Sequence, residues 1–172
     1  KAAILGNFLR ENTKKGENDW IYLIRGKILP DYDLRELGIS TQLVLKILSN
    51  AFSVDEKKVD EMFSKGGDLG EVAEALSKKK KQSSLFSKEL THEEILFSLR
   101  GMLAVEGKGA VGKKVDVVSA LLQRANSREA LYLTRTLMAD LRIGVADSIV
   151  LDAIAFAFFD GNPEVRSKLE DK

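Results

Sequence analysis

The sequence predicts an all-α protein, and three observations support this prediction. Almost every segment places apolar residues at i, i+3, i+4 and i+7, which is the spacing of an amphipathic helix. No segment alternates apolar and polar residues with the period of two that is typical of a half-buried strand. Proline, which kinks or ends helices, occurs only twice in 172 residues. The periodicity predicts about ten helices, at residues 2–12, 17–27, 40–52, 54–64, 69–80, 91–105, 112–125, 127–139, 146–159 and 163–170.

Several of these helices carry a start signal. In a capping box, a side-chain oxygen accepts from the backbone N–H three residues on, while an acid at that position reaches back to the first residue's N–H. Proline at the first helical position is a second start signal, because the missing N–H would have no helical partner there. The capping-box pairs are Ser53 with Glu56, Asp68 with Glu71 and Thr91 with Glu94, and Asn162 with Pro163 is a cap followed by proline.

Composition limits the classes of protein to consider. A hydrophobic fraction of 44%, a charged fraction of 31% and a net charge of +1 are ordinary for a globular domain. The chain has no Cys and a single His, which excludes disulfides, thiolate catalysis and a Cys/His zinc site. We expect His92, beside two glutamates, to lie on the solvated surface, and Trp20 and the eight phenylalanines to lie at core positions. We find no candidate catalytic residue. No apolar run is long enough to cross a membrane and the first residues do not resemble a signal peptide, so we expect an intracellular protein.

An internal repeat predicts the domain organisation. The apolar pattern of residues 37–48 recurs at 143–154, at a constant offset of 106 positions. We expect one two-lobed domain over 1–172 with internal pseudo-twofold symmetry: repeat one at about 20–76, a flexible loop at about 77–90 and repeat two at about 91–172. The offset would place a second copy of Gly67-Asp-Leu-Gly70 just after Lys172. We therefore expect the chain to be a fragment of a longer polypeptide.

Each repeat carries a glycine between two apolar residues, directly before a helix. These glycines are Gly38 and Gly144, and an arginine precedes each of them, Arg35 and Arg142. Glycine tolerates a positive φ and lets another backbone approach closely, and the following helix presents N–H groups suited to a phosphate. The pattern therefore fits a module that holds DNA through its phosphates. The alternative interpretation, which the sequence leaves open, is that both glycines only turn and cap helices in a bundle.

The segment from Gly107 to Lys114 is similar to a phosphate-binding P-loop but lacks two of its parts. A P-loop follows a strand and ends in a Ser or Thr hydroxyl for Mg²⁺, whereas the segment before Gly107 has helical periodicity and the last position is Lys114. We therefore do not expect ATP to bind here. Lysines near a helix N-terminus are unfavourable unless an anion is present, so this glycine loop also indicates a phosphate backbone as its ligand.

Three blocks of the sequence resemble the N-terminal DNA-binding domain of archaeal and eukaryotic ATP-dependent DNA ligases. They are Gly67-Asp-Leu-Gly-Glu-Val-Ala73, the glycine loop with its lysines, and Ser127 to Ala153 with its Leu141-Arg-Ile-Gly-Val145 core. The resemblance implies a helical domain that grips nicked double-stranded DNA in the minor groove, independently of sequence, for replication, recombination and repair. It implies partner adenylation and OB-fold domains in the same polypeptide, which would use ATP and Mg. The Lys-x-Asp-Gly nucleophile motif of the adenylation domain is absent here, so we expect this fragment to hold no cofactor and seal nothing.

Carried over by position, the resemblance assigns contacts with DNA to twelve residues. They are Gly107, Lys108, Gly109, Lys113, Lys114, Arg142, Gly144, Ser148, Arg35, Gly38, Ser40 and Thr41. Ala110 departs from the serine common in the family, which removes one hydroxyl contact.

The basic, serine-rich stretch at 77–88 is open to two interpretations. It is either an exposed linker or a docking segment, because Gln82, Leu85 and Phe86 are similar to the short box by which such ligases bind a sliding clamp (PCNA-like). A location in the archaeal cytoplasm, at the nucleoid, or in a eukaryotic nucleus follows from the same resemblance. The competing hypothesis for the whole chain is a helical protein–protein scaffold that binds no DNA.

Overall fold

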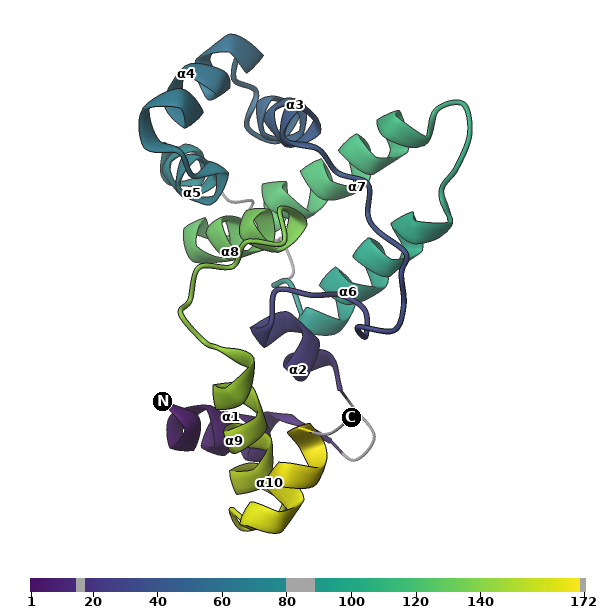
Figure 1. Cartoon of the computed structure of the whole chain (residues 1–172). Coiled ribbons are helices and arrows are strands. Elements are labelled where there is room, and N and C mark those ends of the chain that lie inside the picture. Colours follow the sequence, from purple (N-terminus) through teal and green to yellow (C-terminus); the bar gives the residue numbers. More distant parts are fainter. Residues whose placement is uncertain (15–17, 80–88, 171–172) are drawn as a thin grey trace. The chain divides into compact units, whose positions relative to one another are not determined.

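The computed structural model describes residues 1–14, 18–79 and 89–170, and within these ranges the chain is all-α, as predicted. It forms ten α-helices and one 3₁₀ turn there, with no strand (Figure 1). No helix in the described part is long and apolar enough to cross a membrane. The elements are α1 (Ala2–Asn12), α2 (Asp19–Ile24), α3 (Thr41–Phe52), α4 (Glu56–Gly66), α5 (Leu69–Lys79), α6 (His92–Gly101), η1 (Met102–Ala104), α7 (Ala110–Arg124), α8 (Ser127–Leu137), α9 (Asp147–Phe158) and α10 (Pro163–Glu170).

The helices form two compact units. One unit combines Lys1–Lys27 with Arg142–Lys172, and the other is Ile28–Leu141. We call them the terminal unit and the central unit. Each unit contains segments of both predicted repeats, because Trp20 and Ile21 of α2 pack in one cluster with Ala153 of α9, and α5 packs against α8. The repeat boundaries themselves stay a prediction.

In the terminal unit, α1 and α9 pack so closely that only glycine fits at their contact. A Cβ on Gly6 would lie 2.6 Å from the Phe156 ring and 2.9 Å from the carbonyl oxygen of Ala153. Leu9 is completely buried beside Ala153, and the edge of the Phe8 ring meets Trp20 of α2 with 5.0 Å between ring centroids. Trp20 therefore packs in a core, as the sequence predicted.

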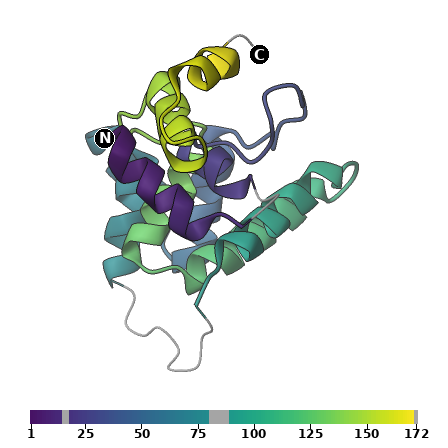
Figure 2. The same ribbon diagram turned by 90° about the horizontal axis from the view of Figure 1, so that it is seen from below.

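In the central unit, two helix pairs carry the core, α5 with α8 and α3 with α7. Fully buried side chains on the second pair include Val44, Ile47, Val118 and Leu122. The helices α6 and α7 form a helical hairpin, and its connecting loop contains the glycine loop (Figures 1 and 2). The hairpin stem is reinforced by an ion pair between Arg124 of α7 and Glu94 of α6.

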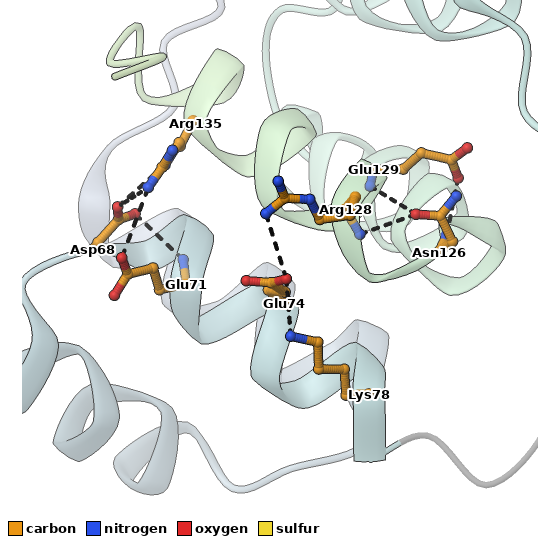
Figure 3. A network of polar contacts seen from close by, with 8 residues as sticks. All are labelled: Asp68, Glu71, Glu74, Lys78, Asn126, Arg128, Glu129 and Arg135. Carbon is orange, nitrogen blue, oxygen red and sulfur yellow. Dashed lines mark hydrogen bonds and ion pairs between the residues drawn. The ribbon is translucent and has the colours of Figure 1, made fainter. Parts of the chain in front are cut away.

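A buried ion pair joins α5 to α8 in the central unit (Figure 3). Asp68 accepts from the Gly70 N–H through Oδ1 at 2.8 Å, and its Oδ2 lies 2.6 Å from a terminal guanidinium nitrogen of Arg135. A Cβ on Gly70 would lie 2.9 Å from the carbonyl oxygen of Leu131 in α8, so the helices can meet only at a glycine. Burial alone would raise the pKa of Asp68, but the hydrogen bonds from Arg135 and Gly70 outweigh it and the pKa is lowered. The Asp-Leu-Gly block thus has a structural role.

The start signals are confirmed at three positions and wrong at one. Asp68, Thr91 and Asn162 each accept a backbone N–H of the first turn that they cap. Ser53 does not cap α4. It ends α3 in the left-handed conformation, with φ 53°, and Asp55 caps α4 instead. A complete capping box that was not among the predicted start signals, Asn126 with Glu129, begins α8 (Figure 3).

Two expectations about exposure are also wrong. The side chain of His92 is only 19% exposed and its Nδ1 lies 3.3 Å from the Glu93 carboxylate, so it is mostly covered rather than solvated. Phe97 is 81% exposed, although all phenylalanines were expected at core positions. Phe97 lies between Leu96 and Leu99 on α6, both fully buried, so it points away from the face that packs.

Candidate nucleic-acid interface

The first glycine corner, residues 37–41, is open and lies at the start of α3. Gly38 has φ 58°, which is a left-handed conformation that favours glycine, and its surface is exposed. Ser40 then takes an extended conformation, and its hydroxyl accepts from the Leu43 N–H at 3.3 Å. The Thr41 residue begins the helix. The corner therefore allows the left-handed turn predicted from the sequence, and Gly38 itself is exposed.

The structure brings the glycine loop and the first corner together. Lys114, in the first turns of α7, donates through Nζ to the carbonyl oxygen of Leu37 at 2.6 Å. Its Nζ would lie 3.4 Å from a Cβ on Gly38, and it is the nearest atom to that position. Two motifs whose contacting residues are 77 positions apart in sequence thus meet in the central unit.

The glycine loop itself turns through two left-handed residues into α7. Gly107 has φ 82° and Gly109 has φ 92°, and no atom lies within 4 Å of a Cβ built on either. Gly109 occupies the N-cap position, so no side chain caps α7. Lys108 and Lys113 are exposed here. Because the first N–H groups of a helix have no partner within the helix, this end of α7 presents backbone donors together with cationic side chains.

The second glycine corner, residues 142–148, belongs to the terminal unit, and its glycine has nearly the same φ as that of the first. Gly144 has φ 61°, close to the 58° of Gly38, and no atom lies within 4 Å of a Cβ built on it. The helices that follow, α3 and α9, both have 12 residues and begin 106 positions apart. Arg142 itself has a φ of 53°, and both Arg142 and Ser148 are exposed.

The two corners differ in their caps and charges. Ala146 stands where the first corner has Ser40, so no side chain caps α9. Asp147, in the first turn, lies where an anion would bind, but Arg25, directly after α2, pairs with it through two hydrogen bonds, with 3.0 Å between Nε and Oδ1. The side chain of Arg25 is only 20% exposed. Arg25 therefore neutralises the one acid in this first turn, a role that the sequence analysis did not assign to it.

Arg35 does not stand alone beside the first corner. Its guanidinium binds both carboxylate oxygens of Asp33, with Nε at 3.0 Å and a terminal nitrogen at 2.6 Å. This hydrogen bond lowers the pKa of Asp33 to about 2. The pair is held in an exposed loop that also presents Tyr32 and Leu34 to solvent. The positive charge of Arg35 is therefore offset by Asp33, which weakens the attraction of Arg35 for a bound anion.

The helices α3 and α7 differ from most others in having no acidic residue in the first turn. Of the ten helices in the described part, seven carry Asp or Glu in the first turn, where a negative charge suits the helix dipole. The exceptions are α1, α3 and α7. Two of the exceptions, α3 and α7, begin at the predicted site. Their N-termini thus keep a positive field that no carboxylate of the first turn offsets.

Two further predictions concern the P-loop similarity and the clamp box. The segment before the glycine loop is α6 and η1, so the strand that a P-loop requires is replaced by helix. The predicted clamp box, Gln82 with Leu85 and Phe86, lies outside the described residues. The pairing of Arg25 with Asp147 has no local signal in the sequence, because the two residues are 122 positions apart.

Comparison with known proteins agrees with these features. Residues 1–155 match the family described as DNA ligase N terminus. Similar chains include the DNA ligase of Nanoarchaeum equitans (strain Kin4-M), 36% identical over 158 residues, which are 92% of this chain and 28% of that protein. The DNA ligase of Nitrosopumilus maritimus (strain SCM1) is 35% identical over 150 residues, covering 87% and 25%. That of Thermococcus fumicolans is 39% identical over 137 residues, covering 80% and 24%.

The chain thus spans about a quarter of the length of the curated relatives it matches. The family match extends over nearly all of it and takes in both glycine corners and the glycine loop. This chain belongs to the family of DNA ligase N-terminal domains.

Proposed function

We propose that this chain binds nicked double-stranded DNA, independently of sequence, as the N-terminal module of an ATP-dependent DNA ligase. The observation that carries the proposal is the pair of exposed glycine corners whose glycines have matching left-handed φ values, 58° at Gly38 and 61° at Gly144. Each begins a helix whose N–H groups favour an anion. A duplex offers phosphates at regular spacing, so a protein with several such seats can hold it without reading bases.

The charges around the corners support a phosphate ligand. Lys108 and Lys113 are exposed beside the uncapped start of α7, where a positive charge opposes the helix dipole. A phosphate would offset both the lysine charges and the dipole. Sequence independence follows from the chemistry, because backbone N–H groups and lysines contact phosphates rather than the donor and acceptor pattern of the base edges.

The experiment is a titration of nicked and intact duplexes with the 172-residue chain, measured by fluorescence anisotropy over a series of salt concentrations. Binding should weaken with a slope of log K against log salt of about −0.9 for each phosphate neutralised. Lys113→Gln should weaken binding to every duplex sequence and reduce that slope by about one contact. Lys57→Gln removes the same charge from an exposed position on α4 and is the matched control. The slope for Lys57→Gln should equal that of the unchanged chain.

Two results would contradict the proposal. Affinity that does not change between low and moderate salt would exclude phosphate neutralisation as the source of binding. Absence of binding to any duplex would favour the competing hypothesis of a helical protein–protein scaffold. Equal affinity for nicked and intact duplex would leave duplex binding in place and remove preference for the nick.

The rest of the ligase enters this proposal through the family. Adenylation and OB-fold domains of the same polypeptide would supply ATP and Mg chemistry for sealing nicks in replication and repair, and this chain would hold the duplex.

For the clamp box we propose docking of Leu85 and Phe86 in an apolar pocket of a sliding clamp. A peptide of residues 78–90 should bind the clamp in calorimetry, and Phe86→Ala should abolish the heat. An unchanged heat for Phe86→Ala would remove this part.

A further inference from the structure

Resting on the proposed function, we infer that Lys114 is a positioning residue, which holds the first glycine corner in its phosphate-binding conformation instead of contacting a phosphate itself. The sequence assigned Lys113 and Lys114 the same role. The structure separates them, because Lys113 is exposed whereas Lys114 is half-buried with its ammonium group on the corner. The two neighbours therefore act on DNA in different ways.

The contact of Lys114 is made with the backbone of the corner. Its Nζ lies 2.6 Å from the carbonyl oxygen of Leu37, which is short for a hydrogen bond and is typical of a charged donor. That carbonyl belongs to the peptide that joins Leu37 to Gly38, so the bond fixes the orientation of the left-handed residue. An exposed glycine has many accessible backbone conformations, which favours loss of the turn. A charge-assisted hydrogen bond of this kind stabilises the turn against that loss.

The base from which Lys114 reaches the corner is rigid. The next residue along α7, Val115, is 5% exposed, and Val118 one turn later is fully buried. The hydroxyl of Ser119 donates to the carbonyl oxygen of Ile47 in α3 at 3.3 Å. Because α7 is packed against α3 in this way, Lys114 connects the loop before α3 to a helix that is already fixed to α3.

The terminal unit has a related contact, in which the acceptor is the carbonyl oxygen of the corner glycine itself rather than that of the residue before it. The Nζ of Lys1, at the start of α1, lies 3.4 Å from the carbonyl oxygen of Gly144. Gly6 of α1 meets the Ala153 carbonyl in α9, as Ser119 of α7 meets the Ile47 carbonyl in α3. Lys1 precedes Gly6 by five positions, and Lys114 precedes Ser119 by the same five. Lys1 is the N-cap residue of α1 and Lys114 lies inside α7, but each binds a carbonyl oxygen of a corner from five positions before the packing contact, which indicates a related way of holding these turns.

The test compares Lys114→Met with Lys113→Met and Lys114→Arg in the 172-residue chain. One readout is the salt dependence of duplex binding. The other, in the absence of DNA, is amide hydrogen exchange at Leu43 and Val44, whose N–H groups donate to Ser40 of the corner. Lys114→Met should weaken binding roughly tenfold, the order of one charge-assisted hydrogen bond, without changing the salt slope, and should speed exchange at the corner by a similar factor.

The matched variants separate positioning from contact. Lys113→Met should reduce the salt slope by about 0.9 and leave exchange at the corner unchanged. Lys114→Arg keeps a charged donor and should restore most of the affinity and of the exchange protection. These results together would support the positioning role, because a direct phosphate contact changes the slope and not the exchange of the free protein.

Three outcomes would overturn the inference. If Lys114→Met lowers the slope as much as Lys113→Met while exchange stays unchanged, Lys114 contacts a phosphate directly. If Lys114→Met binds DNA as the unchanged chain does, Lys114 has no role in binding, and the proposed function survives. If the unchanged chain binds no duplex at all, the proposed function fails first and the inference fails with it.

Discussion

Removal of the Asp68 carboxylate should destabilise the central unit more than loss of any exposed ion pair. The side chains of Asp68 and Arg135 are only 7% and 14% exposed, so Asp68→Ala leaves a covered guanidinium with weaker compensation. The remaining partner, Glu71, is 3.9 Å away from Arg135 and 63% exposed. Breaking a buried pair from one side costs about 3–5 kcal/mol. A chain of this size loses roughly 2–4 °C of Tm for each kcal/mol, so we expect Tm to fall by on the order of 10 °C.

The assay is thermal and urea unfolding followed by circular dichroism, with two controls. Arg35→Ala breaks an ion pair with Asp33 in which the arginine side chain is 63% exposed, and it should leave Tm nearly unchanged. Adding Arg135→Met to Asp68→Ala removes the stranded charge and should recover part of the lost stability. A Tm for Asp68→Ala no lower than that of Arg35→Ala would refute the reasoning that burial gives this pair its weight.

Three further predictions use the same unfolding measurements. Because the folded pKa of Asp68 is lowered from 3.8, its stabilisation is present above that value and is lost as pH falls through the lower folded pKa. The Tm of Asp68→Asn should therefore depend less on acid pH than that of the unchanged chain, and equal acid dependence would contradict this. Gly6→Ala should cost about 1–3 kcal/mol because its Cβ would meet the Ala153 carbonyl at 2.9 Å. Gly101→Ala, at the open end of α6, should be neutral or stabilising by about 0.4–1 kcal/mol, and equal losses in both would count against the packing argument. Thr134 is completely buried and its hydroxyl has no hydrogen-bond partner among the described residues, so Thr134→Val should keep or raise Tm, and a clear loss would reveal a missed partner.

Helix positions were predictable because they depend on local pattern. The predicted span 2–12 matches α1, and 163–170 matches α10, where a cap and a proline mark the start. The error at Ser53 has a physical cause, since the residue that ends α3 in a left-handed conformation cannot also take the extended conformation of an N-cap. The left-handed glycines of both corners agree with the sequence as well, because a glycine between two apolar residues before a helix permits a turn with positive φ.

The partners of the charged residues were not predictable. Nothing local in the sequence pairs Asp68 with Arg135, 67 positions later, or directs Lys114 to the Leu37 carbonyl rather than to solvent. Arg25 and Asp147 likewise meet only after α2 and α9 have packed in one unit. Such contacts depend on which helix faces meet, and the amphipathic pattern tells only that a face is buried, not against which partner.

By itself the sequence determined the helices, the left-handed turns and the family, because these follow from the periodicity of apolar residues, the freedom of glycine and a nearly full-length match. Only the tertiary structure decided which charged side chains are paired within the fold and which remain exposed at the surface. Lys113 and Lys114 are the same residue type and adjacent in sequence, yet Lys113 is exposed and Lys114 is half-buried. The reason is that successive residues of a helix point in different directions, so that in α7 Lys114 faces the first glycine corner while Lys113 faces solvent.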